Sequence, residues 1–287
     1  MKASIADVQT GLDGFQWIVA LESELLASID RTCELSIDGW LDANMCAPLG
    51  AILRRHAARG KNIVLSGHMP DIFRKNGFLS EFGIASTKDT HRTTIGYRRF
   101  SLKDKEAFQV YIVSHFKPKI RGLPLMTDAL LRKFRESLFE VYGNAVDHSE
   151  TELGIFACGQ HYPRDHRLDF SIADLGISIR GRILKDLGTE MTPSQAIRWA
   201  MEGNTTRKGR PGGLGLQLIQ EFIRLNGGRI VVVSGSGYWE LSEEQSWKPR
   251  AEVLRCAFPG TVVTIEVNAA DKKSYRLSSE VDPTRIF

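Results

Sequence analysis

Residues 127–149, TDALLRKFRESLFEVYGNAVDHS, form the most strongly helical stretch of this 287-residue sequence. The polar residues of its second half fall within roughly one quadrant of a helical wheel. They are Glu140, Asn144, Asp147 and His148. The opposite arc is apolar and holds Leu131, Phe134, Leu138, Val141, Tyr142, Ala145 and Val146. We therefore expect one face of this helix to enter a core, and the other to line a site or meet solvent.

Two weak helix formers in the interior of this stretch favour a site. Gly143 and Asn144 cost roughly 1 and 0.5 kcal/mol relative to alanine, whereas a solvated face would more economically use Lys, Glu or Gln. A glycine permits close approach of a ligand. An amide oxygen beside two carboxylates suits Mg²⁺, which accepts few protein ligands together with phosphate oxygens.

The segment SIADLGISI, residues 171–179, places Asp174 at the end of an apolar strand, followed by Gly176. Such an arrangement can aim the carboxylate at a buried donor, while the glycine lets a flat ring approach the backbone. An ordinary turn after a strand is the alternative interpretation.

A glycine-rich segment, GRPGGLGLQLIQEFIRLNGG, covers residues 209–228. Gly212, Gly213 and Gly215 lie at the start of a helix expected over residues 214–226 and ended by Gly227. Free backbone N–H groups at a helix N-terminus, together with the helix dipole, bind phosphate. A flexible hinge is the alternative interpretation.

Other nucleotide-binding signatures do not fit. Gly60 and Lys61 lack the upstream glycine of a P-loop, and no GxGxxG follows a strand. A Gly-rich loop followed by the HRD and DFG motifs of a protein kinase is also missing.

Four motifs in order resemble the GHKL ATPase superfamily. They are E140-xxx-N144-xx-D147-H148, D174-x-G176, GGLGL at Gly212 to Leu216, and G260-T261 at the start of the last strand. The resemblance covers residues 125–268 and is closest to the anti-sigma-factor kinases. It implies Mg²⁺ as cofactor and ATP as substrate or ligand.

The resemblance implies a role for each matching position. Glu140 would be the general base that activates the attacking water or hydroxyl, and Asn144 would coordinate Mg²⁺. Asp174 would accept from the adenine amino group. Supporting contacts would come from Asp147 behind the site, Gly176 beside the ring, Thr261 through water, and Gly212, Gly213, Leu214, Gly215 and Leu216 at the phosphates.

Residues 203–213, GNTTRKGRPGG, resemble a nucleotide lid. Thr205, Thr206, Arg207, Lys208 and Arg210 could touch the terminal phosphate, although a solvated mobile loop is an equal alternative. Ser178 stands where many relatives have the second glycine of DxGxG, which puts the shape of that loop in question.

The same resemblance favours some functions within the superfamily. His115 lies too close to Asn144 for a histidine-kinase phosphoacceptor module, and a transducer domain like that of the topoisomerases does not follow. We expect an ATP-binding regulatory protein in signal transduction, either a Mg²⁺-dependent ATPase or an anti-sigma-type protein kinase. The alternative is a nucleotide-gated switch that binds a partner with little turnover. A protein partner is expected, and self-association as a homodimer is left open.

The predicted fold is an α/β protein, an α+β sandwich in two parts. Residues 1–117 would form a small α/β domain, with strands at 33–37 and 61–66 and helices at 42–59 and 72–76. It loosely resembles STAS modules. Residues 118–124 would be a linker and residues 125–268 a Bergerat-type mixed sheet covered by helices. Residues 269–287 would be a tail.

Composition excludes several classes. The chain is 42% hydrophobic and 25% charged, which is typical of a globular protein. Its net charge is +4 and it contains no run of five or six like charges, so nucleic-acid binding is not expected. Four scattered cysteines predict neither disulfides nor a zinc site. Neither a signal sequence nor a membrane segment is recognisable, so we expect a cytoplasmic protein without membrane association.

Overall fold

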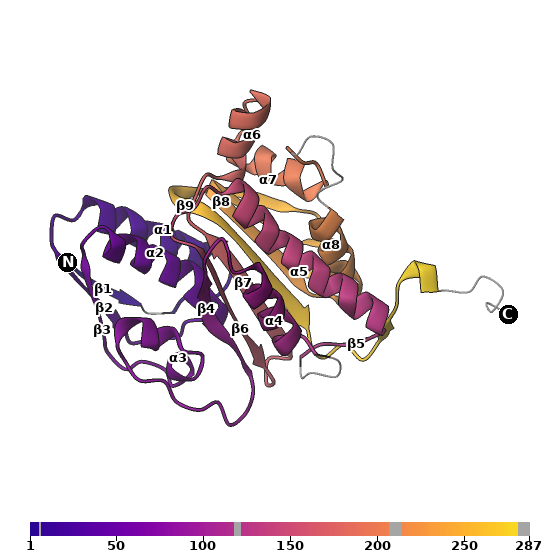
Figure 1. Ribbon diagram of the computed structural model, residues 1–287, viewed down its shortest axis with the longest axis horizontal. Helices are drawn as coiled ribbons and strands as arrows, with labels where there is room; N and C mark the ends of the chain where they lie inside the picture. Colours follow the sequence, from indigo (N-terminus) through magenta and orange to yellow (C-terminus); the bar gives the residue numbers. More distant parts are fainter. Residues whose placement is uncertain (6, 118–121, 207–213, 281–287) are drawn as a thin grey trace.

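The computed structural model describes residues 1–5, 7–117, 122–206 and 214–280. Within these residues the strands form a three-stranded sheet, a five-stranded sheet and a two-stranded pairing, and helices cover the two larger sheets (Figure 1). The predicted α/β class is confirmed.

The three-stranded sheet belongs to an N-terminal layer and is parallel. Its strands follow the order β1 (Lys2–Ile5), β2 (Thr32–Ile37) and β3 (Asn62–Ser66). Every second residue of β2 is buried, namely Cys33, Leu35 and Ile37, because only one face of this sheet is covered. The helical segments of this layer are α1 (Leu12–Ala27), η1 (Ala43–Met45), α2 (Cys46–Ala58), α3 (Ile72–Lys75) and η2 (Phe78–Phe82).

The five-stranded sheet has the order β4-β6-β7-β9-β8, and each neighbouring pair is antiparallel. Its strands are β4 (Thr94–Phe100), β6 (Ile155–Tyr162), β7 (Arg167–Asp174), β9 (Arg250–Asn268) and β8 (Arg229–Ser242). The predicted mixed sheet is therefore wrong for the C-terminal part, whose five-stranded sheet is antiparallel throughout. Of the two larger sheets, it is the three-stranded sheet of the N-terminal layer that has parallel pairs. The last strand, expected to start at Gly260 and Thr261, is the second half of one long strand, β9.

Helices cover the front face of this sheet. They are α4 (Lys105–His115), α5 (Asp128–His148), α6 (Ile179–Leu187), α7 (Pro193–Met201) and α8 (Leu214–Asn226). The predicted helix 127–149 is α5, and the Thr127 hydroxyl caps it by accepting from the Leu130 N–H at 3.2 Å. Its apolar face packs against front-face strand residues such as Phe170 and Ile172.

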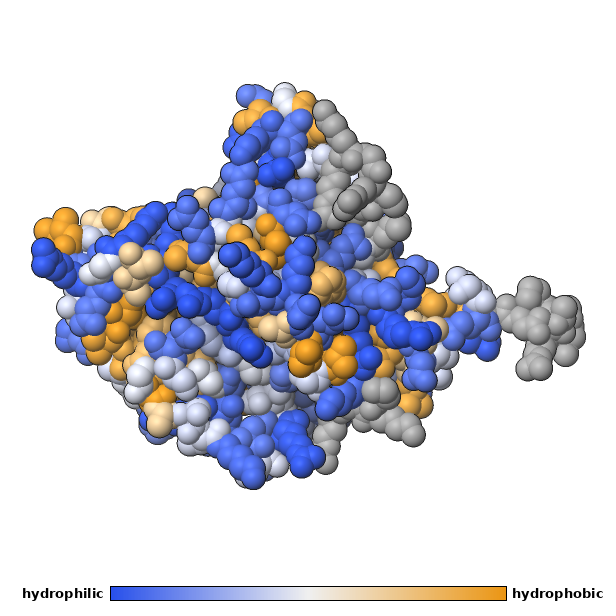
Figure 2. All heavy atoms as spheres, viewed as in Figure 1, coloured by the Kyte–Doolittle hydropathy of each residue, from blue (hydrophilic) through white to orange (hydrophobic). Residues whose placement is uncertain are grey.

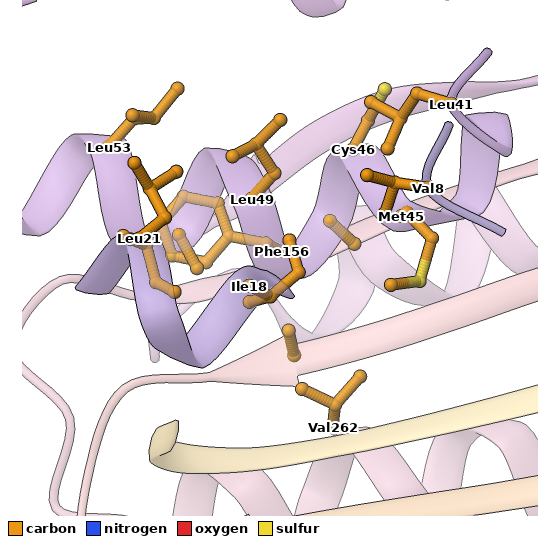
Figure 3. Packing of buried hydrophobic residues seen from close by; sticks show 14 of the residues in the cluster. Val8, Ile18, Leu21, Leu41, Met45, Cys46, Leu49, Leu53, Phe156 and Val262 are labelled. Atoms are coloured by element: carbon orange, nitrogen blue, oxygen red, sulfur yellow. The ribbon is translucent and has the colours of Figure 1, made fainter. Parts of the chain in front are cut away.

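The N-terminal layer packs on the back face of the same sheet. Figure 3 shows apolar side chains of α1 and α2 directed toward strands β6 and β9, where Phe156 and Val262 lie. Polar contacts cross the same seam: the Asn44 amide donates to Ser171 at 3.0 Å, and the Ala43 N–H donates to the Tyr162 hydroxyl at 2.7 Å. The back face of the sheet is thus buried by the N-terminal layer.

The predicted domain limits do not coincide with the packing. β4 lies within the range predicted for the N-terminal domain, yet it pairs with β6 as the first strand of the five-stranded sheet. α4 packs against α5 and joins the front-face core. β5 (Leu125–Met126) pairs with β10 (Ser274–Tyr275) in the predicted tail, which also contains η4 (Ser278–Glu280). The predicted and observed limits differ because these strands pair with distant segments, which local composition does not indicate.

The described helices contain no segment long and apolar enough to cross a bilayer. Figure 2 shows hydrophilic residues over much of the face in view, with apolar residues in small groups between them.

Candidate functional site

A pocket opens between the C-terminal half of α5, helices α6 and α7, and the adjacent ends of β7 and β9. Of the residues predicted to contact the nucleotide, those that line it are Asn144, Asp174, Thr205, Thr206, Leu216 and Thr261. Its cavity volume is about 140 Å³, and the pocket is partly open to solvent.

Asp174 is the buried acidic group of this pocket. It ends β7, where it pairs in register with Thr261 of β9, and it is 5% exposed. Burial raises the pKa of Asp174 to about 8, although backbone N–H groups of Thr261 and Gly176 donate to the carboxyl group and oppose the shift. Its Oδ1 has no hydrogen-bond partner among the described residues. A ligand with an N–H donor would satisfy that atom.

Gly176 lies in the loop after β7, where it packs closely against the end of α5. A Cβ at this position would overlap the carbonyl oxygen of Ser149, the residue that follows α5. The next residue, Ile177, donates its N–H to the same carbonyl at 2.6 Å. The glycine therefore allows the loop after β7 to close against the end of α5. Gly260 acts similarly, since a Cβ there would overlap the Asp174 carbonyl oxygen.

Thr261 helps to position α6 over the pocket. Its hydroxyl lies 2.9 Å from that of Ser234 on β8, and Ser234 Oγ accepts from the Ile179 N–H at 2.9 Å. Ser178 caps α6 by accepting from the Gly181 N–H at 3.1 Å. The residue that departs from the DxGxG pattern therefore starts a helix.

The polar stripe of α5 divides between pocket, helix contact and solvent. Asn144 lines the pocket, whereas Asp147 is exposed. Glu140 lies one turn before Asn144 and faces the first turn of α8. A Cβ on Gly215 would lie 2.7 Å from a Glu140 carboxylate oxygen. Gly215 thus allows the N-terminus of α8 to approach this carboxylate.

The beginning of the predicted lid is anchored to its surroundings. The Thr206 side chain makes a hydrogen bond to Asp186 near the end of α6, which contributes to lowering the pKa of that carboxyl group. Gln217 and Gln220 of α8 donate to backbone carbonyls of Glu202 and Met201 at 2.8 and 2.6 Å. α8 is therefore joined to the end of α7.

Several predicted site residues cannot be placed. Lys208, Gly212 and Gly213, together with Arg207 and Arg210, lie outside the described residues. For Leu214 only the backbone, as the first residue of α8, is described.

Sequence reasoning missed α6 and α7, which form one wall of the pocket. Arg182 and Ile183 of α6 and Trp199 of α7 line the pocket. A usable signal was present: Thr192 and Gln195 form a capping box around Pro193 at the start of α7. Arg182 is held by Glu150 at 3.1 Å and by Asp186 at 2.6 Å.

The described residues contain no group of three or more His, Cys, Asp or Glu side chains placed to hold a metal ion. A cation at Asn144 would therefore take most of its ligands from a bound phosphate or from water. No protein-family model and no curated protein matches the chain.

Proposed function

We propose that the chain is an ATP-binding regulatory protein of the GHKL superfamily and that the pocket at Asp174 holds the adenine. The observation that carries this proposal is the buried carboxyl group of Asp174, which lines the pocket and whose Oδ1 lacks a donor among the described residues. The exocyclic amino group of adenine is such a donor. Apolar walls from Ile172, Ile177 and Val263 suit the faces of a planar ring.

The phosphates would extend toward the start of α8. This helix has 13 residues, and its N-terminal N–H groups and dipole favour negative charge. Asn144 would hold Mg²⁺, which neutralises phosphate charge when bound. The position of Glu140 beside Gly215 puts a carboxylate where it could accept a proton from an attacking water or hydroxyl group.

The favoured activity is Mg²⁺-dependent phosphoryl transfer from ATP, to water or to a protein hydroxyl group. A nucleotide-gated switch is the second candidate. The contact between Thr206 and Asp186 supports it, because nucleotide binding that reorganised the lid would also change the surface near α6. Cytoplasmic location and a protein partner are parts of the same proposal.

Phosphate release from Mg-ATP separates the two candidates. We expect Glu140→Ala to lower the rate by about 100-fold or more, as loss of a general base does, while ATP still binds. Glu136→Ala is the matched control, because Glu136 lies one turn earlier on α5, is 62% exposed and pairs with Lys133. Equal, negligible release from wild type and Glu140→Ala, with tight ATP binding in both, would contradict the enzyme and favour the switch.

A further inference from the structure

Helix α6 has few apolar contacts with the rest of the molecule. It spans Ile179–Leu187, and Ile183 is its one buried residue. In Figure 1 it stands above the upper end of the five-stranded sheet, and it packs against α7 and β8. A helix of 9 residues is too short to be stable by itself. Contacts from outside the helix therefore decide how firmly α6 is held.

Charged groups supply part of this attachment. The Glu150 carboxylate lies 3.1 Å from Arg182 and also contacts Lys185. Glu150 has a φ of 55°, in the left-handed region that side chains other than glycine adopt at a cost. The chain after α5 thus accepts backbone strain at the residue whose carboxylate holds α6.

The two sides of α6 face different surroundings. Arg182 and Ile183 line the pocket that contains Asp174. On a helical wheel, Arg180, Leu184 and Leu187 fall within about 60° of one another, and Leu184 lies nearly opposite Arg182. We call these three residues the outer face of α6.

The outer face is open to solvent. The exposed fractions of Leu184 and Leu187 are 42% and 43%, and Arg180 is exposed as well. The two leucines are neighbours on the helix surface, because residues three apart lie on the same side. Figure 2 shows apolar groups among hydrophilic ones at the top of the molecule, where α6 stands in Figure 1. Paired leucines of this kind are typical anchors of helix packing.

Helix α4 provides an internal comparison. It also exposes an apolar pair three residues apart, Val110 and Val113. However, α4 buries Phe108, Tyr111 and Ile112 against the molecule, so its position needs no further contact. The exposed leucines of α6 belong to a helix with much less packing of its own, which would gain more from a partner.

Charges of opposite sign lie at the two ends of the outer face. Arg180 is in the first turn of α6, and Glu190 lies three residues after its last residue; both are exposed. Two copies of α6 packed antiparallel would place Leu184 against the partner's Leu187. The same arrangement would bring Arg180 near the partner's Glu190, and antiparallel helix dipoles attract each other. A two-fold interface contains every such contact twice.

We propose that the outer face of α6 is the interface of a homodimer with antiparallel α6 helices. A face with an apolar centre and both signs of charge is complementary to a copy of itself, whereas charge of one sign would select a different partner. The dimer would cover both leucines. It would also fix one wall of the pocket, because the other side of the same helix lines it. The inference does not depend on which ligand the pocket holds.

Sedimentation velocity of the nucleotide-free full chain, from about 1 µM to about 1 mM, tests the proposal. We expect a dissociation constant of about 10–100 µM, because two short helices form a small interface. Leu184→Gln should weaken the dimer at least tenfold or about that, since apolar contact is lost twice. Its urea midpoint should stay near that of wild type, as expected at an exposed position. Val110→Gln is the matched control on α4 and should leave the dissociation constant unchanged.

Charge reversal tests the antiparallel arrangement. Arg180→Glu and Glu190→Arg should each weaken the dimer about fivefold, because like charges then face each other. The double variant should return to within about twofold of wild type. A monomer at every concentration, a dimer unaffected by Leu184→Gln, an equal loss in Val110→Gln, or a double variant no tighter than the single ones would overturn the proposal.

Discussion

Asp169 and Asp174 occupy the same strand, and both are buried carboxyl groups whose Oδ1 has no hydrogen-bond partner in the described part of the chain. They lie on opposite faces of the sheet and in different electrostatic surroundings. Asp169 contacts Arg167 and belongs to a network of ion pairs that joins the two layers. Asp174 accepts from the backbone N–H groups of Thr261 and Gly176. The comparison indicates that one end of β7 holds the layers together, while the other keeps an acceptor ready for a ligand.

The first prediction breaks the network at the Asp169 end. Arg167→Met leaves Asp42 and Asp169 buried without their cation, since their side chains are 1% and 0% exposed. We expect the free energy of unfolding to fall by about 3–5 kcal/mol, measured by urea denaturation at pH 7.5. Arg164→Met, at an exposed position in the same β6–β7 turn, should change it by less than about 0.5 kcal/mol. Equal effects of the two substitutions would show that the network does not join the layers.

The second prediction concerns pH at the Asp174 end. The unfolded chain ionises Asp174 near its ordinary value of 3.8, whereas the folded chain keeps the proton up to about 8. Stability from this group is therefore present at low pH and is lost as pH rises toward 8. Asp174→Asn lacks this titration, so its stability relative to wild type should increase by about 2–3 kcal/mol between pH 5.5 and 7.5.

Urea denaturation at several pH values measures this difference. Asp128→Asn is the control, because Asp128 is exposed at the start of α5. Its stability relative to wild type should stay nearly constant over the same range. A pH-independent difference for Asp174→Asn would mean that Asp174 is ionised in the folded protein at neutral pH.

Local patterns predicted the elements that carry these residues. The helical periodicity of residues 127–149 identified α5, and the apolar run before Asp174 identified the end of β7. Both signals depend on neighbours in sequence. The position of Gly215 beside Glu140 is a tertiary contact between two helices, which no local pattern contains.

The parts that were not predicted depend on distant segments. β4 joins the five-stranded sheet by pairing with β6, more than fifty residues later in the chain. The ion pairs of Arg167 link it to Asp42 in the N-terminal layer. α6 and α7 are short, with 9 residues each, so their stability depends on packing against each other and on β8.

Binding of Mg-ATP to Asp174→Asn tests the central claim most directly. Calorimetric titration at pH 7.5 should give saturable binding to wild type and an affinity about 10- to 100-fold lower for Asp174→Asn, because an amide, unlike the carboxyl group, cannot ionise to become a charged acceptor when the adenine amino group binds. Asp128→Asn should bind as wild type does. Equal affinity of wild type and Asp174→Asn for ATP, or no ATP binding to the wild-type chain, would contradict the assignment of this pocket to adenine.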